Sequence, residues 1–384
     1  MKKALILVSV ASMIDQFNML NIKVLQEMGC EIHVAANFHS GSTTSNERVN
    51  SFREKLDSLG IKVHHILINR SVLSKDNIRA YKEVKSLIER ERFDVVHCHS
   101  PIGGVLVRLA ARKKRDKTKV IYTAHGFHFF KGSSKLSWIA YYPIEKWLSR
   151  YTDCLITINK EDYKISNTYF SAKTSEFVNG IGIDLGRFKP QTIESKMEYR
   201  EKYGFREEDF ILIYAGELSS RKHQDLLIQT IHLLENKVPN IRLLLAGKGT
   251  EREKYESMVE RLNLHDKVLF LGYREDINNL MLSSDVAVSS SRQEGLPVNV
   301  MEAMATALPL IVTDCRGNKD LVVNNLNGYV VGINDPNAFA GAIERLYSSM
   351  DLRREFGMQS QNLIKEYSNE VVRKQIEKIY MRYI

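Results

Sequence analysis

The stretch VAVSSSRQEGLPVNVMEAMATALPLIVTD, residues 286–314, contains a strand, a turn, a helix and a second strand in that order. Val286–Ser289 and Leu310–Thr313 are short apolar runs with β-branched residues, whereas the apolar residues of Asn299–Ala305 have helical spacing. Two buried strands joined by a helix are typical of a parallel sheet with helices on both faces. The stretch therefore predicts an α/β fold with a doubly wound parallel sheet.

The same alternation of strands and helices continues through the rest of the chain. Further strands are expected at Ala4–Val10, Glu31–Ala36, Val63–Ile66, Asp94–His97, Lys119–Thr123, Cys154–Ile158, Phe210–Ala215, Arg242–Ala246 and Val268–Leu271. Amphipathic helices are expected between them, including Ile22–Met28, Asn77–Glu91, Asp225–Asn236 and Glu251–Leu262. Two such sheets in series predict two Rossmann-like domains that face each other across a cleft.

The domain boundary is expected where the pattern is interrupted. Glycines and a proline interrupt it in NGIGIDLGRFKP, residues 179–190, which predicts a first domain at 1–190 and a second at 191–368. The amphipathic segment 369–384 is expected to be a helix that crosses back and packs on the first domain. Ligands of open parallel sheets bind beyond the carboxyl ends of the strands, so the loops after the strands are the places to look for a site.

The composition is that of a globular protein. Hydrophobic residues make up 43% and charged residues 26% of the 384 positions, and no apolar run reaches the ~18 residues that a membrane-spanning helix needs. The apolar run after MKK is short and Asp15 follows it closely, which favours a buried first strand over a signal peptide. Four separated cysteines without a Cys-x-x-Cys pair favour reduced thiols and a cytoplasmic location.

The net charge of +9 is unevenly distributed. Residues 1–190 contain 30 basic against 18 acidic residues, a balance of +12, and residues 191–384 contain 25 against 28, a balance of −3. This surplus predicts an anionic partner for the first half, which is nucleic acid, anionic lipid or a phosphorylated substrate. The sequence contains no recognised nucleic-acid-binding module, so nucleic acid is the least favoured of the three.

Two glutamates flank the turn of the opening stretch. Glu294 lies in the turn, and Glu302 lies on the helix, roughly 7–8 Å from a helix start that we expect at Pro297. The free N–H groups at the start of a helix suit a diphosphate, so one carboxylate is expected to bind ribose hydroxyls and the other sugar hydroxyls. The alternatives are two solvated surface charges, or the acid and nucleophile of a glycosidase.

Two cations follow the strand Phe210–Ala215 and precede a helix. A nucleoside-diphosphate leaving group needs positive charge, and Arg221 with Lys222 would supply it, unless the pair is only a solvated helix entry. The segment Gly247–Gly249 lacks the third glycine of a dinucleotide motif, because Arg252 occupies that position. This disfavours a nicotinamide site, and the glycines are instead expected to let the backbone approach a nucleotide.

The spacing of Glu294 and Glu302, with seven residues between them, resembles the Glu-x7-Glu signature of retaining glycosyltransferase family 4, whose members have the GT-B fold. The resemblance covers essentially the whole chain. Four further motifs occupy the places expected for this family, namely NGIGIDLGRF (179–188), AGELSSRKHQDLLIQ (215–229), AGKGTER (246–252) and LGYRED (271–276).

The resemblance implies roles for the site residues. Glu302 is expected to bind the ribose, and Glu294 the hydroxyls of the transferred sugar. Arg221 and Lys222 are expected to bind the diphosphate, and His125 in TAHGFHFFKG (123–132) to contact the sugar. Main-chain groups are expected to read the base, usually uracil, and the residues lining the nucleotide would be Gly216, Gly247, Gly272, Tyr273, Leu296, Val298 and Asn299. The sequence contains no Asp-x-Asp pair, which is typical of an enzyme without a metal or other cofactor.

Two features of the first half need separate interpretations. His97 and His99 share one strand face near His125, and structural polar contacts are favoured over a zinc site. The loop SVASMIDQFNMLN (9–21) lacks the glycine pair that many family members carry after the first strand. Asp15 and Asn18 are therefore expected on the acceptor side, although Asp15 would alternatively cap a helix that begins near residue 17.

Both tryptophans lie in KLSWIAYYPIEKWLSR, residues 135–150. Aromatic rings flanked by cations suit the headgroup region of a membrane. The residues expected to contact it are Trp138, Tyr141, Lys146 and Trp147. The basic cluster RKKRDKTK (112–119) would add electrostatic attraction. An ordinary helix that packs its aromatic face inward is the alternative.

The segments MIDQFN (13–18) and YYPIEKWLSRYTDCLITINKEDY (141–163) resemble a subgroup that assembles exopolysaccharide, capsule or other glycan repeat units. The resemblance implies a retaining, metal-independent glycosyltransferase that moves a sugar, with an N-acetylhexosamine as first candidate, from a UDP-sugar to a polyprenyl-diphosphate-linked saccharide. Such an enzyme is expected in the cytoplasm, peripheral on the inner face of the cell membrane. The alternatives are a nucleotide-sugar epimerase, a phosphorylase and a non-catalytic nucleotide-sugar-binding subunit.

Overall fold

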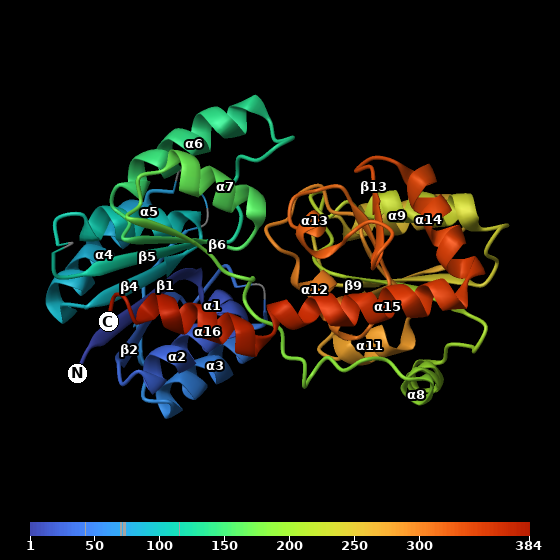
Figure 1. Ribbon diagram of the computed structural model, residues 1–384, viewed down its shortest axis with the longest axis horizontal. Helices are drawn as coiled ribbons and strands as arrows, with labels where there is room; N and C mark the ends of the chain where they lie inside the picture. The colour runs from blue at the N-terminus through green and yellow to red at the C-terminus, as the bar shows by residue number, and fades with distance from the viewer. Residues whose placement is uncertain (43, 70, 72–73, 115) are drawn as a thin grey trace. The chain divides into compact units, whose positions relative to one another are not determined.

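The computed structural model describes residues 1–42, 44–69, 71, 74–114 and 116–384. The chain forms two compact units (Figure 1). The first unit contains Met1–Gly182 together with the C-terminal segment Asn369–Ile384, and the second unit contains Ile183–Ser368.

The first unit ends after Gly182, earlier than the boundary predicted after Pro190. Ile183 is already tied to the second unit, because its N–H donates to the carbonyl of Tyr367 at 2.9 Å. Ile183 also forms an isolated parallel β-bridge with Ser368. The predicted linker therefore belongs to the second unit over most of its length.

A seven-stranded parallel sheet in the order β3-β2-β1-β4-β5-β6-β7 forms the centre of the first unit. Its strands are β1 (Lys3–Val10), β2 (Glu31–Asn37), β3 (Lys62–His65), β4 (Val95–His99), β5 (Lys119–Ala124), β6 (Cys154–Thr157) and β7 (Thr174–Phe177). Its helices are α1 (Ala11–Phe17), α2 (Met19–Glu27), α3 (Asn46–Ser58), α4 (Asp76–Glu91), α5 (Pro101–Ala111), α6 (Lys135–Ser149), α7 (Lys160–Tyr169) and α16 (Asn369–Tyr380). The chain winds outward from β1 in both directions, which confirms the predicted doubly wound topology.

Helices cover both faces of this sheet. On one face, α2, α3 and α16 pack through buried side chains that include Leu25, Phe52 and Tyr380. On the other face, α4 and α5 pack through residues such as Val84 and Val107. The helix α16 at the end of the chain is therefore part of the first unit's core. Each of its fully buried aliphatic side chains contributes roughly 1.5–3 kcal/mol to the stability of that unit.

A six-stranded parallel sheet in the order β10-β9-β8-β11-β12-β13 forms the centre of the second unit. Its strands are β8 (Phe210–Ala215), β9 (Ile241–Ala246), β10 (Val268–Gly272), β11 (Val286–Ser289), β12 (Leu310–Thr313) and β13 (Gly328–Val331). Its helices are α8 (Ile193–Tyr203), α9 (Gln224–Leu234), α10 (Arg252–Arg261), α11 (Ile277–Ser283), α12 (Val298–Ala305), α13 (Asn318–Leu321), α14 (Pro336–Ser348), α15 (Met350–Ile364) and the 3₁₀ turn η1 (Lys365–Tyr367).

The sequence did not predict the edge strands β7 and β13. β7 has the sequence TSEF, and all four of its residues are only partly buried, so it has no apolar run. β13 has four residues and begins with Gly328, a residue type depleted from strands. Glycine is required there, because a Cβ at Gly328 would lie 2.1 Å from the carbonyl oxygen of Leu310 on the neighbouring strand.

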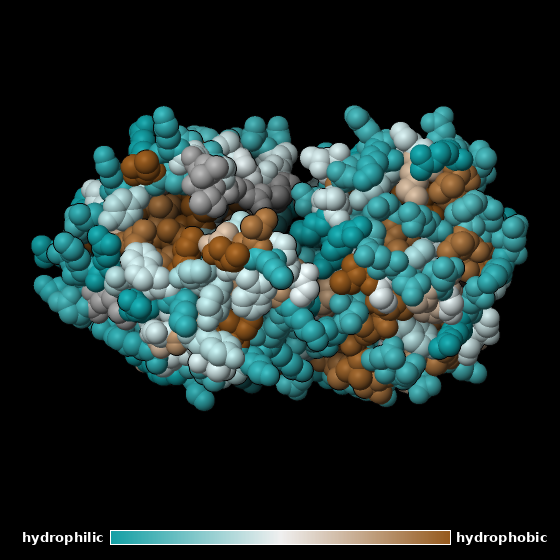
Figure 2. Space-filling model, turned by 90° about the horizontal axis from the view of Figure 1, so that it is seen from above, coloured by the Kyte–Doolittle hydropathy of each residue, from teal (hydrophilic) through white to brown (hydrophobic). Residues whose placement is uncertain are grey.

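Some apolar side chains remain on the surface. Figure 2 shows such side chains on the face that it views, and the exposed apolar residues of the first unit include Leu136 and Ile139 of α6. Over the ranges that the structure describes, no helix has the length and apolarity needed to span a membrane.

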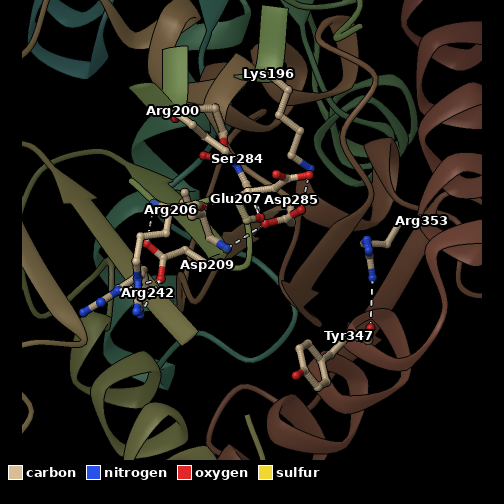
Figure 3. A network of polar contacts seen from close by, with 12 residues as sticks. Lys196, Arg200, Arg206, Glu207, Asp209, Arg242, Ser284, Asp285, Tyr347 and Arg353 are labelled. Atoms are coloured by element: carbon tan, nitrogen blue, oxygen red, sulfur yellow. Dashed lines mark hydrogen bonds and ion pairs between the residues drawn. The ribbon is translucent and has the colours of Figure 1, made fainter. Parts of the chain in front are cut away.

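A buried ion network holds α8 against the amino ends of the second sheet's strands (Figure 3). Asp285, directly before β11, accepts hydrogen bonds from Lys196 at 2.5 Å and Arg200 at 2.7 Å. The oxygen that binds Arg200, Oδ2 of Asp285, also accepts a hydrogen bond from the backbone N–H of Ile211 at 2.7 Å. Because these groups lie at the amino ends of the strands, they belong to the scaffold of the unit and not to a ligand site of the usual kind.

Candidate functional site

The strand order of the second sheet reverses between β8 and β11. β9 and β10 follow β8 on one side, while β12 and β13 follow β11 on the other. Ligands of doubly wound sheets bind at the carboxyl ends of the strands at such a switch point. The loop after β8 carries Arg221 and Lys222, and the loop after β11 carries Glu294. The fold therefore brings three of the predicted site residues to one place.

Lys222 and Glu294 form the centre of this site. The Nζ of Lys222 lies 2.5 Å from Oε1 of Glu294, and their side chains are only 12% and 8% exposed. The hydroxyl of Ser291 donates to the same carboxylate oxygen at 2.6 Å. Arg221 lies 3.6 Å from the other carboxylate oxygen. Glu294 is thus not a solvated surface charge, which excludes that interpretation for this residue.

Both members of the buried pair are ionised. Burial would raise the pKa of Glu294, but the charges of Lys222 and Arg221 and two hydrogen bonds hold that pKa below its usual value. Burial would also lower the pKa of Lys222, yet Tyr214 and Glu294 raise it above the usual value. The site therefore keeps an anion and two cations together in surroundings that strengthen electrostatic interactions.

Hydrogen bonds join the two loops that carry these residues. The guanidinium of Arg221 donates to the carbonyl of Gln293 at 3.1 Å, and the N–H of Arg292 donates to the carbonyl of Arg221 at 2.9 Å. The hydroxyl of Ser290 donates to the carbonyl of Lys222 at 2.8 Å. The cations are consequently held on a rigid support, although the Arg221 side chain itself is 45% exposed.

The helix α12 begins next to this pair. Pro297 is its N-cap and Val298 its first residue, so the predicted start at Pro297 is one residue too early. In the described structure no side chain caps this end. Val298 and Asn299 lie in the first turn and are partly buried, while Leu296 is buried just before it. Free N–H groups and the positive end of the helix dipole are suited to an anionic ligand.

Glu302 lies one helical turn further along α12. Its burial raises its pKa to about 7, against the opposing effect of the Arg187 charge. Its carboxyl group is therefore partly protonated near neutral pH, unlike that of Glu294. The two predicted carboxylates, Glu294 in the loop after β11 and Glu302 on α12, therefore differ in charge state.

Glycines allow the loops of this edge to approach each other. A Cβ at Gly247 would lie 1.8 Å from the carbonyl oxygen of Gly216, and a Cβ at Gly249 would lie 2.0 Å from that of Leu218. The loops after β8 and β9 therefore pack backbone against backbone. At the end of β10, Gly272 has a φ of +65° that favours glycine, and the next residue, Tyr273, is 45% exposed.

His125 follows β5 in the first unit and is paired with His99. The Nε2 of His125 lies 3.0 Å from Nδ1 of His99, and both rings line a pocket together with Phe17, Asn21 and Thr123. Burial lowers the pKa of His125 to about 4 and that of His99 well below its usual value, so both imidazoles are neutral. The structure places His125 at a pocket wall, next to a histidine that the sequence assigned only to structural contacts.

The hydrogen-bond geometry selects a tautomer for this pair. The Nε2 of His99 is buried and has no hydrogen-bond partner among the described residues. A buried N–H without an acceptor is rarer than a lone pair without a donor, so Nε2 of His99 carries the lone pair. His99 then donates from Nδ1 to Nε2 of His125, which leaves Nδ1–H of His125 as a donor. Sequence reasoning missed this role, and the shared strand face of His97 and His99 was its only signal.

The predicted acceptor residues have structural partners. Asp15 lies inside α1, so the interpretation as a helix cap is wrong, and its carboxylate accepts from Nε of Arg48 at 3.0 Å. The physical reason is that α1 begins directly after β1, where a glycine turn was absent. Asn18 is fully buried, donates to the carbonyl of Met13 at 2.9 Å and accepts from Asn21 at 3.0 Å. This placement does not favour the predicted contact of Asn18 with an acceptor.

The aromatic segment forms α6, and its residues divide between two faces. Trp138 and Tyr141 are partly buried against the core of the first unit, and Nε1 of Trp138 donates to the carbonyl of Phe130 at 3.3 Å. Trp147 is 42% exposed, and Lys146 is also exposed. The inward packing of Trp138 and Tyr141 does not favour their predicted membrane contact, and the contact of all four residues stays a prediction. Arg115 of the predicted basic cluster lies outside the described residues.

The described residues contain no group of three or more His, Cys, Asp or Glu side chains arranged to hold a metal ion. The four cysteines are all free and buried. His97 donates to or accepts from Thr123 and Tyr380, both at 2.7 Å, which accounts for both of its ring nitrogens.

Comparison with known protein families matches both units. Residues 195–363 match the family described as Glycosyl transferases group 1, and residues 21–181 match Glycosyltransferase Family 4. The chain is 40% identical over 385 aligned positions to the putative glycosyltransferase EpsD of Bacillus subtilis, covering 100% of this chain and 97% of that protein. It is 33% identical to the UDP-Gal:alpha-D-GlcNAc-diphosphoundecaprenol alpha-1,3-galactosyltransferase of Escherichia coli, and the aligned part covers 70% of this chain and 72% of that protein.

Solved structures have a similar fold. Anabaena Alr3699/HepE in complex with UDP superposes with a TM-score of 0.80 at 18% identity, covering 100% of both chains. The same protein in complex with UDP-glucose gives a TM-score of 0.79 at 17% identity, again over 100% of both chains. At this identity the likeness concerns the fold.

Proposed function

We propose a donor and an acceptor for this chain, which belongs to the group 1 glycosyltransferases and has the GT-B fold. The donor is a UDP-sugar, with an N-acetylhexosamine or a hexose as the transferred group. The acceptor is a saccharide linked to a polyprenyl diphosphate, in the assembly of exopolysaccharide, capsule or a related glycan. Transfer retains the anomeric configuration and requires no metal ion.

This proposal rests on the buried Lys222–Glu294 ion pair, together with the half-exposed Arg221, beside the start of α12. Departure of UDP leaves negative charge on the diphosphate, and catalysis needs positive groups already placed where that charge develops. Two cations and the N–H groups of a helix start meet this need at one point of the sheet edge. The cations are already at this edge before a ligand binds, and donor binding has only to exchange their partners.

Each carboxylate has a separate role in the proposed reaction. Glu302 accepts hydrogen bonds from the ribose, and Glu294 accepts them from the hydroxyls of the transferred sugar while its cations turn to the diphosphate. The acceptor hydroxyl attacks the anomeric carbon from the side on which UDP leaves, and the departing phosphate takes the hydroxyl proton. The Nδ1–H of His125 donates to the sugar. The protein thus contributes positioning and charge stabilisation.

The known proteins support the choice of substrates. The solved HepE structures contain UDP and UDP-glucose, and the name of the Escherichia coli relative specifies a UDP-galactose donor and a diphosphoundecaprenol-linked acceptor. The positive balance of residues 1–190 agrees with an acceptor that carries a diphosphate and lies in an anionic membrane. We therefore place the enzyme in the cytoplasm, peripheral on the inner face of the cell membrane.

The test is a transfer assay with purified protein. A panel of UDP-sugars is combined with polyprenyl-diphosphate-linked mono- and disaccharides, and released UDP and the lipid-linked product are both measured. We expect UDP release from one donor, only when an acceptor is present, and unchanged by a chelator. Conversion of the UDP-sugar without an acceptor would identify an epimerase instead. Binding of UDP-sugar without release, for every acceptor tested, would identify a non-catalytic subunit.

A further inference from the structure

The helix α6 has apolar side chains on two opposite faces. Its inner face packs on the first unit through Trp138, Tyr142 and the fully buried Leu148. Its outer face, named here the α6 outer face, consists of exposed residues with helical spacing, namely Leu136, Ile139, Ala140, Pro143, Ile144 and Trp147. A helix at the surface of a globular domain normally carries polar residues on this side.

The exposure of this face is large. Leu136 is 77% exposed, Ile139 71%, Ile144 47% and Trp147 42%. Single exposed apolar residues are ordinary, but a contiguous apolar patch on one face marks a surface for a partner or a membrane. The spacing of three and four residues places all six side chains on one stripe that is about three turns long.

The exposed charged residues of the α6 segment are positive. Lys135, Lys146 and Arg150 are exposed at the edges of the α6 outer face, and the single acidic residue of the segment, Glu145, is buried. The segment after α5, the helix that contacts α6, carries further exposed cations and one exposed acidic residue, namely Arg112, Lys113, Lys114, Lys117 and Asp116. An apolar stripe bordered by cations is complementary to a surface that is apolar inside and anionic outside, as an anionic phospholipid layer is.

The α6 outer face is held in place by a buried ion pair behind it. Arg108 of α5 donates to Glu145 at 2.8 Å and to the carbonyl of Gly104 at 2.9 Å. Its guanidinium stacks over the ring of Tyr122 at 4.1 Å, and the hydroxyl of Tyr122 donates to Glu145 at 3.3 Å. Glu145 points inward, so the helix cannot rotate its apolar stripe into the core without burying Glu145's charge elsewhere.

We propose that the α6 outer face docks on an anionic phospholipid membrane, with Leu136, Ile139, Ile144 and Trp147 inserted at the level of the acyl-chain boundary. Lys146 and its basic neighbours contact the lipid phosphates. Trp138 and Tyr141 have no part in this contact, because they belong to the inner face. This inference extends the proposed function. The purpose of the docking, which is to bring the enzyme to a lipid-linked acceptor, rests on that proposed function.

The test measures vesicle binding by the full chain without donor or acceptor. Sedimentation is compared for vesicles of pure phosphatidylcholine and for vesicles containing about one third phosphatidylglycerol. The variant L136S/I139S/I144S removes three apolar side chains and leaves all charges in place. We expect the original protein to bind the anionic vesicles, more weakly at high salt, and the variant to bind them at least tenfold more weakly. A blue shift of tryptophan emission on binding is expected only for the original protein.

A matched control replaces equally exposed apolar residues of the second unit. I193S/L233S alters side chains that are 68% and 43% exposed, and this variant is expected to bind vesicles as the original protein does. Both variants are expected to show the tryptophan melting transition of the original protein, which reports the first unit and shows that it is folded. Equal vesicle binding by the triple variant, or no vesicle binding by the original protein, overturns the proposal. The proposal is also overturned if the original protein is a dimer and the triple variant is a monomer, because the α6 outer face would then bind a second copy of the chain. Since no transfer is measured, these results are independent of the donor and acceptor.

Discussion

The Nζ of Lys222 and Oε1 of Glu294 lie 2.5 Å apart, although 72 positions separate the two residues in the chain. Their loops leave β8 and β11, which are neighbours in the sheet. The charges that the proposed reaction requires are therefore assembled before any ligand binds, and donor binding exchanges their partners.

Lys222→Met is expected to lower kcat by roughly 10²–10³-fold, because it removes a cation that stabilises the leaving diphosphate. It also leaves the carboxylate of Glu294 buried without its main partner, which costs roughly 3–5 kcal/mol of unfolding free energy. UDP release and denaturant unfolding measure the two effects. In K222M/E294Q the stability is expected to return while the turnover stays low. Recovery of turnover in the double variant would contradict the assigned roles.

The affinity for UDP is expected to rise with pH through about 7. Burial raises the pKa of Glu302 to about 7, and ribose hydroxyls donate to the ionised carboxylate, so binding favours the deprotonated form. Calorimetry between pH 6 and 8 measures this dependence. Glu302→Gln is expected to bind UDP more weakly at pH 8 and to lose most of the dependence. An identical pH profile for the variant would exclude Glu302 from ribose binding.

The first unit is expected to lose stability as the pH falls from about 6.5 to about 4. Its folded form lowers the pKa of six histidines, His33, His64, His65, His97, His99 and His125. The unfolded chain binds more protons in this window, so protonation favours unfolding. Both tryptophans belong to this unit, and their fluorescence reports its melting. A tryptophan transition at the same temperature at pH 7 and pH 5 would contradict this expectation.

Asp285→Ala is expected to destabilise the protein by about 3–5 kcal/mol, because it leaves the buried guanidinium of Arg200 and the N–H of Ile211 without their acceptor. UDP affinity is expected to change little, since Asp285 lies at the amino ends of the strands. Glu344→Ala is the control, because its ion pair with Lys237 is exposed, and it is expected to cost less than about 1 kcal/mol. Thermal unfolding with and without UDP separates the two effects.

Gly247→Ala is expected to abolish most UDP binding. Its Cβ would lie 1.8 Å from the carbonyl oxygen of Gly216, so the loops after β8 and β9 would have to separate. Gly341→Ala in α14 is the matched control, since apart from its chain neighbours and the backbone of its own helix no atom of the described residues lies within 4 Å of the added Cβ. That substitution is expected to stabilise the protein by about 0.5–1 kcal/mol, because alanine loses less backbone entropy in a helix. Equal UDP affinities for the two variants would contradict the packed-loop interpretation.

The strands and helices of the central sheets were predictable because their signals are local. β8, β11 and β12 have the predicted bounds, since each is a buried apolar run limited by polar residues or turns. The edge strands β7 and β13 were missed because they are short and β7 is only partly buried. The sequence located the turn at the boundary between the units but not the unit to which the turn belongs. That assignment depends on contacts with residues nearly two hundred positions away, such as the hydrogen bond between Ile183 and Tyr367.

The sequence by itself determined the parallel α/β architecture, the family and the two glutamates of the candidate site, because periodicity and motif spacing are written within short segments. Only the tertiary structure decided which side chains meet. Lys222 faces Glu294, His99 selects the tautomer of His125, and Trp138 turns inward while Ile139 turns outward. The physical reason is that hydrogen-bond partners, pKa shifts and exposure depend on distances between segments far apart in the chain. A sequence pattern does not contain those distances until the sheets and helices have packed.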